Sequence, residues 1–189
     1  MTAKIKLNAA SGGGSFSLQA PSSSANNRVM TLPDTADGTV LTTTNPASGT
    51  VIQAKSTAAS SAGQISTTAD SYNDVTGIDL LITPKFSNST MILITNFHCD
   101  TAAANRNASL RLTFDHSGIS QTAIDTNQDG YSLQSGADAF NGFGIMIYTH
   151  SPSTTNEITY RLQFRNVGGS GTVYLNRKPT KIIAYEVAA

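Results

Sequence analysis

Oxygen-bearing side chains recur at alternate positions in one short segment. Asp125, Asn127 and Asp129 precede a glycine, which matches the first six positions of a calcium-binding loop, where alternate residues supply oxygen ligands and the glycine permits a sharp turn. The match fails at position twelve, where Gly136 replaces the usual bidentate Glu, although Asp138 lies close enough in sequence to substitute. We expect a polar surface loop, with calcium as the one cofactor for which these residues offer a site.

Three histidines suggest a second kind of chemistry. His98, His116 and His150 occur with Asp100, Asp115 and many serines nearby. However, the chain has no Gly-x-Ser-x-Gly nucleophile elbow and no His-Glu-x-x-His or paired-cysteine spacing. We therefore expect that the protein is not an enzyme. We expect His98 and His150 to be rim residues that each end an apolar strand.

Composition restricts the partners. The 189 residues include 12 basic and 12 acidic ones, so the chain has no net field to attract nucleic acid or an anionic membrane. No segment approaches the ~20 apolar residues that span a bilayer. Basic residues gather near the C-terminal end of the sequence: Arg161, Arg165, Arg177, Lys178 and Lys181. We interpret them as a solvated face, a contact across a subunit boundary or a site for an acidic glycan.

Alternating apolar runs at short intervals follow residue 50 and predict an all-β fold. We expect strands at 50–56, 64–67, 77–83, 91–97, 108–114, 131–134, 142–149, 157–164, 172–176 and 181–187. Ten short strands in about 140 residues are typical of a sandwich or jelly roll. The apolar strand near the C-terminal end of the sequence should lie in the centre of a sheet, and removing it should destroy the fold.

Two strands are apolar at every position instead of alternating. They lie at 91–94 and 144–148, and continuous apolar runs suit strands that are covered on both faces. Because a sandwich strand has one inner face, we expect a second subunit to provide the other cover. The candidate subunit-interface residues are Ile92, Ile94, Ile145, Ile147 and Tyr185.

Residues 1–49 differ from residues 50–189 and form a separate predicted segment. Apolar residues recur there every eleven positions among Ser, Thr, Gly, Ala, Asn and Pro. So few apolar side chains cannot offset an ordering entropy of about 1 to 2 kcal/mol per residue. The segment is a disordered linker, or short strands that wind with copies of themselves or lie along a host surface. Its candidate anchoring or oligomer-interface residues are Leu7, Phe16, Leu18, Val29, Leu32, Val40 and Val51.

Three segments carry a family resemblance: Ile78 to Ile94, Tyr160 to Arg177 and the closing strand that ends at Val187. They resemble the C-terminal β domain of tail-fibre and other virion proteins of tailed bacteriophages, especially marine cyanophages. The leader, with its Lys-Leu-Asn opening, Gly/Ser run and Gly-Thr-Val-Leu-Thr-Thr segment, is similar to the leaders of such proteins. The resemblance implies a trimeric jelly roll at the end of, or along, a virion appendage.

We therefore expect a non-enzymatic virion structural protein, a homotrimer whose N-terminal segment anchors it to other proteins of the head or tail. The alternative is a receptor-binding fibre tip that holds a host surface glycan on loops between residues 98 and 141. A third interpretation, a depolymerase, requires acidic residues that converge in a cleft. Glu157 and Glu186 are few candidates for such a site. Neither nucleic acid nor a membrane is an expected partner.

Overall fold

The computed structural model describes residues 4–19, 22–25, 46–59, 64–101, 104, 106–125, 130–134, 139–168, 171–175 and 179–189. The chain divides into two compact units, Met1–Val40 and Leu41–Ala189. The predicted interface residues Val29, Leu32 and Val40, and the predicted ligands Asn127 and Asp129, lie outside the described residues.

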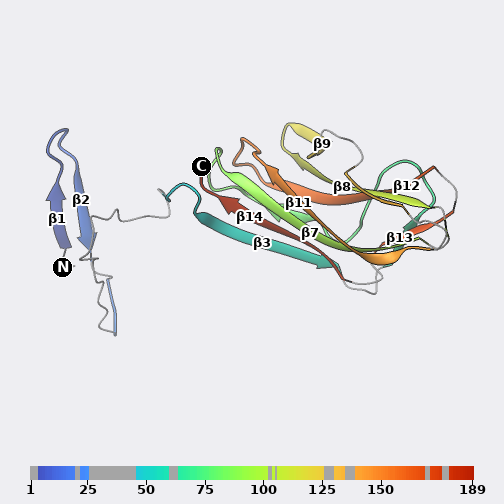
Figure 1. Ribbon diagram of the computed structural model, residues 1–189. Helices are drawn as coiled ribbons and strands as arrows, with labels where there is room; N and C mark the ends of the chain where they lie inside the picture. Colours follow the sequence, from blue (N-terminus) through green and yellow to red (C-terminus); the bar gives the residue numbers. More distant parts are fainter. Residues whose placement is uncertain are drawn as a thin grey trace. The chain divides into compact units, whose positions relative to one another are not determined.

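The first unit contains an antiparallel hairpin of β1 (Lys4–Asn8) and β2 (Ser15–Gln19), drawn in blue in Figure 1. Gly12 and Gly13 lie in its turn with φ angles of 81° and 68°, which glycine adopts without steric cost. The Ala9 N–H donates a 2.8 Å hydrogen bond to the Gly14 carbonyl and closes the loop. The segments that carry the predicted residues Leu7 and Leu18 are therefore paired with each other.

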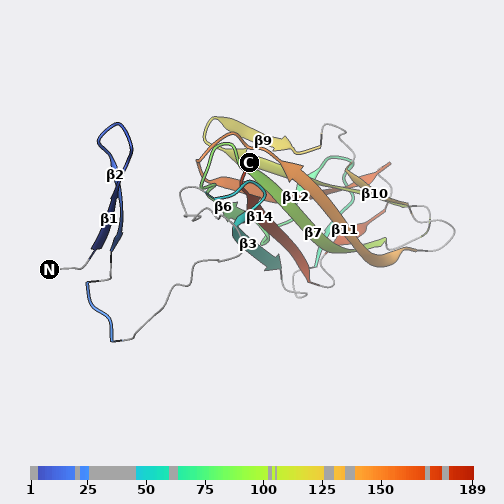
Figure 2. The same cartoon turned by 60° about the vertical axis from the view of Figure 1, so that its left-hand side comes forward.

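The second unit is a β-sandwich of two six-stranded sheets in which every strand pair is antiparallel. Figures 1 and 2 show the two layers. The first, the β7 sheet, comprises β3 (Val51–Ala59), β4 (Ile65–Thr67), β7 (Thr90–Thr101), β11 (Asn141–His150), β13 (Val173–Leu175) and β14 (Thr180–Val187). The second, the β8 sheet, comprises β5 (Asn73–Asp74), β6 (Leu80–Ile82), β8 (Asn107–His116), β9 (Ile119–Ala123), β10 (Tyr131–Gln134) and β12 (Ile158–Val167).

The all-β prediction is confirmed, and each of the ten predicted strands overlaps an observed one. Two differences matter for function. The strand predicted to end at Phe97 continues to Thr101, so His98 lies inside a strand and is 3% exposed instead of lying on a rim. The block 98–141, expected to supply loops, contains β8, β9 and β10, and Leu110 and Leu112 lie in the core. Among the described residues, no helix is long and apolar enough to cross a bilayer.

The core lies between the two sheets because strand alternation turns one face of each sheet inward. Leu93 and Phe97 point into it from β7, and Leu112 and Tyr160 from the β8 sheet, all at most 1% exposed. The Phe97 ring meets Tyr131 edge-on with centroids 5.2 Å apart. This contact joins the two sheets.

The strand nearest the C-terminal end, β14, lies between β3 and β7, as predicted for an apolar terminal strand. Its register sets Ile183 beside Ile94, and Tyr185 beside Ile92. β14 therefore places its alternate side chains on the same outer surface as those of β7.

Candidate functional site

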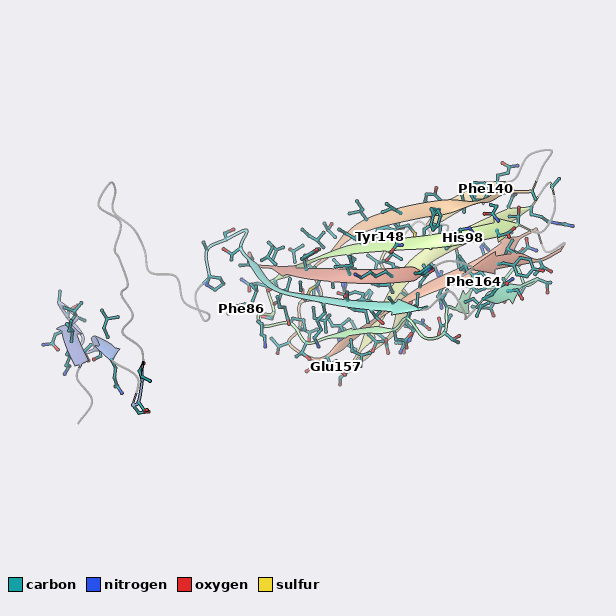
Figure 3. The ribbon with its side chains drawn as sticks, turned by 90° about the horizontal axis from the view of Figure 1, so that it is seen from below. Phe86, His98, Phe140, Tyr148, Glu157 and Phe164 are labelled. Atoms are coloured by element: carbon teal, nitrogen blue, oxygen red, sulfur yellow. The ribbon has the colours of Figure 1, made fainter. Side chains whose placement is uncertain are left out.

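The outer surface of the β7 sheet, which faces away from the core, carries a cluster of large apolar side chains. Figure 3 views β11, β7, β14 and β3 side by side. We call the cluster the apolar face, and its members are Ile92 and Ile94 from β7, Phe143, Ile145 and Ile147 from β11, and Ile183 and Tyr185 from β14. The structure thus brings all five predicted interface residues onto one surface.

Cross-strand pairing arranges the apolar face in rows. Ile147 pairs with Ile94, which pairs on its other side with Ile183. Phe143, Ile145 and Ile147 are 64%, 61% and 66% exposed, whereas the members from β7 and β14 are half-buried. Over three strands about 4.8 Å apart and six residue steps of about 3.4 Å, the apolar face covers roughly 300 Å². Apolar patches of this size on soluble proteins are often binding surfaces.

Phe143 lies beside a polar chain on the same surface, because His98 is its direct cross-strand partner. The His98 ring lies edge-on to the Phe143 ring with centroids 5.0 Å apart, and Figure 3 labels His98 on β7. His98 Nε2 lies 3.0 Å from Asn141 Oδ1, and Asn141 Nδ2 donates to Asp100 Oδ2 at 3.2 Å. His98 therefore supports an exposed aromatic ring.

The outer surface of the β8 sheet is mostly polar, with Leu81 as an exposed apolar side chain, and its central arginine, Arg161, is ion-paired. Arg161 forms ion pairs with Asp79 and Asp115. A second polar chain lies beside it, in which Arg111 Nε donates to Gln163 Oε1 at 2.8 Å and Gln163 Nε2 donates to Asp74 at 2.7 Å. The two outer surfaces of the sandwich thus differ sharply in chemistry.

The basic residues near the C-terminal end of the sequence have different surroundings in the structure. Arg161 has carboxylate partners within its own chain, and Arg165 pairs with Asp70 at 3.5 Å. Lys181 is half-buried beside Asn96 at the margin of the apolar face. Arg177 and Lys178 lie outside the described residues.

The candidate calcium loop begins directly after β9. Asp125 is half-buried there, and no group of three or more potential metal-ligating side chains occurs among the described residues. Gly130 has its own structural requirement, since a Cβ at this position would overlap the Leu110 carbonyl oxygen and its φ is 45°. Packing against β8 therefore explains this glycine without a cation, and the calcium site stays a prediction.

The histidines have structural partners. His150 Nδ1 lies 2.8 Å from the Tyr160 hydroxyl, and the His150 ring packs against Phe114 with centroids 4.1 Å apart. The His116 ring stacks on the same Phe114 ring, with centroids 6.2 Å apart. Burial, with a smaller contribution from His116, lowers the pKa of His150 to about 4. His150 is therefore neutral near pH 7 and packs as an aromatic residue.

Of the four remaining predicted interface residues in the described segments, three are exposed, and the side chain of the fourth, Phe16, lies outside what the structure describes. Leu7 and Leu18 in the hairpin are 58% and 42% exposed, and Val51 at the start of β3 is 53% exposed. Phe143 and Ile183 of the apolar face are not among the predicted interface residues. Both alternate with predicted residues, Phe143 with Ile145 and Ile183 with Tyr185, and this period-two spacing could have identified them.

Comparisons with known proteins give no family assignment. No family profile and no curated protein matches the sequence. The chain is similar to solved structures of infectious bursal disease virus, a Gt-strain particle (11% identity, TM-score 0.39, 94% of this chain and 48% of that chain) and a VP2 subviral particle (12%, 0.43, 94% and 48%). A third is a T=1 particle derived from that virus (10%, 0.41, 92% and 45%). The chain spans about half the length of these proteins, and TM-scores below 0.5 do not establish a shared fold.

Proposed function

We propose that this protein is a non-enzymatic structural protein of a virion that works as a homo-oligomer, with copies joined through the apolar face. The observation that carries the proposal is the exposure of Phe143, Ile145 and Ile147 on one surface. A patch of about 300 Å² is as large as the largest apolar patch on a typical monomer and is often functional. Among the described strands β11 pairs only with β7, so it is an exposed apolar edge strand and an aggregation hazard. A second copy that covers this patch removes the hazard.

The chemistry of the apolar face favours a second copy as the occupant. The rows from Thr149 to Ile145 carry one charged residue, Lys181, so the matching surface has to be apolar and nearly uncharged. The paired charges on the β8 sheet do not meet that requirement. Other copies of the same face do: two of them can meet across a twofold axis, and three can line a threefold axis as in the trimer proposed below.

The order of the oligomer, three, and its place in a phage virion come from the sequence resemblance. A jelly-roll trimer that projects from a head or tail, anchored by residues 1–49, is the arrangement which that resemblance implies. The roughly 300 Å² of the apolar face is less than the ~800 Å² per partner of a typical interface. The leader therefore has to add contact area.

A paired set of variants tests the apolar face. Ile145→Asp with Ile147→Asp places two charges on it, whereas Leu81→Asp places one on the outer surface of the β8 sheet, where Leu81 is 45% exposed. We expect wild type and Leu81→Asp to sediment as the same oligomer and the double variant to sediment as a folded monomer, with its fold checked by circular dichroism. A monomeric wild type at tens of micromolar, or an oligomer unchanged by the two aspartates, would refute the proposal.

The virion role has its own test. Labelled antibodies, or images of whole particles at modest resolution, should show the protein on intact virions. On a glycan array, the protein should bind no glycan. Specific binding to one glycan would instead favour the receptor-tip alternative. Host polysaccharide should remain intact after incubation with the protein, since we propose no hydrolytic activity.

A further inference from the structure

The β1–β2 hairpin has two chemically different faces. Ile5 lies opposite Leu18 in the register, and Leu7 lies two residues beyond Ile5. Because opposite and alternate residues share a face, Ile5, Leu7 and Leu18 project from one side, whereas Lys6 and Ser17 project from the other. Ile5, Leu7 and Leu18 are 64%, 58% and 42% exposed.

This hairpin is too small to be stable with its apolar side in water. Each strand has five residues, and a lone two-stranded hairpin is at best marginally stable. In the described part of the chain, no further strand pairs with β1 or β2. The turn at Gly12 and Gly13 shapes the hairpin, but the cover for its apolar side has to come from elsewhere.

We infer that the hairpins of neighbouring copies pack apolar side against apolar side and form a second self-association site. The occupant is thus the same segment of another copy. This inference rests on the proposed homo-oligomer. It assigns the hairpin to self-association and leaves the proposed attachment to other virion proteins to the rest of residues 1–49.

Size and charge both favour another hairpin as the occupant. The apolar side is two strands wide, about 10 Å, and the three apolar side chains carry no charge. Packing these sides together leaves Lys6 of each copy facing water, so no like charges are brought together. If copies are joined through their sandwich units, a contact between their hairpins forms within one complex, which favours it over a contact between separate molecules.

Cysteine cross-linking in the full-length protein tests the contact. Leu7→Cys and Leu18→Cys place a thiol on the apolar side, and Lys6→Cys and Ser17→Cys are the matched controls on the opposite side of the same strands. The native Cys99 adds little background, because it is fully buried and burial, followed by the charge of Asp100, raises the pKa of its thiol to about 12. A short bis-maleimide reagent then reports thiols that lie close together between chains.

We expect the apolar-side variants to cross-link between chains at least tenfold faster than their controls. Equal rates on both sides, or no cross-linking in a sample that light scattering shows to be an intact oligomer, would overturn the hairpin contact and leave the proposed oligomer standing. A monomeric sample would overturn the proposed oligomer, and this inference with it. In intact particles, a cross-link from Leu7→Cys to a different virion protein would also overturn the inference.

Discussion

Ser89 and Glu186 are 97 positions apart in the chain, and the Ser89 hydroxyl donates a 2.7 Å hydrogen bond to Glu186 Oε1 within the protein interior. Both residues are fully buried. Glu186 Oε1 also accepts hydrogen bonds from the Lys85 and Phe86 backbone N–H groups at 2.7 and 3.2 Å, and Gln53 Nε2 donates to Oε2. One carboxylate in β14 thus holds the turn before β7.

Replacing this carboxylate should destabilise the sandwich strongly. Glu186→Ala leaves the donors of Lys85, Phe86 and Ser89 unsatisfied in a buried site, and we expect a loss of about 3 to 5 kcal/mol of unfolding free energy. Glu186→Gln keeps one acceptor oxygen and should lose about half as much. Urea denaturation measures both variants. If alanine were no worse than glutamine, the hydrogen bonds would not be the cause.

Acid should weaken the fold through His150. Its pKa falls from 6.5 to about 4 on folding, mainly because of burial. Between these pH values the unfolded chain binds a proton that the folded chain does not, so stability declines as pH falls from about 6.5 to about 4. Because the side chain is only half-buried, solvent screening reduces the effect, and we expect a loss of about 1 to 2 kcal/mol.

The His150→Gln variant isolates this contribution, since Gln keeps a hydrogen-bonding partner for the Tyr160 hydroxyl and does not titrate. Urea denaturation from pH 7.5 to pH 4 should show a flatter profile for the variant than for wild type. Parallel profiles would assign the acid sensitivity to other groups.

The two ion pairs of Arg161 should differ in strength. The Asp115 side chain is 33% exposed and the Asp79 side chain 42%, so the Asp115 pair is less screened by water. Asp115→Asn should cost up to about 1 kcal/mol and Asp79→Asn less. Urea denaturation in low and high sodium chloride measures this, and the difference between the variants should shrink in high salt. A larger cost for Asp79→Asn would reverse the assignment.

Gly144 should tolerate no side chain. A Cβ at this position would overlap the Phe97 ring, which is fully buried and packs edge-on against Tyr131. Gly144→Ala should therefore destabilise the sandwich by about 1 to 3 kcal/mol through overpacking. Adding Phe97→Leu should make the combined loss smaller than the sum of the two single losses. Strict additivity would show that the two positions do not interact.

The strands were predictable because their signal is local. Side chains alternate with a period of two along a strand, so Leu110 and Leu112, and likewise Tyr160 and Leu162, were recognisable as inward-facing from their spacing. β5 and β9 were missed because they are short and polar, and β7 extends beyond its predicted end because its last residues are polar but buried.

The sequence alone determined that this chain forms many short strands, that the last strand lies inside a sheet, and that β7 and β11 have more apolar surface than one core can cover. Only the tertiary structure decided that β14 lies beside β7, which gathers Ile92, Ile94, Ile183 and Tyr185 on one face, and that Arg161 meets two carboxylates of its own chain. The physical reason is the separation along the sequence between the residues that interact. Alternation acts between adjacent residues, whereas strand order and charge pairing depend on packing between segments about 40 to 100 positions apart, which no local pattern encodes.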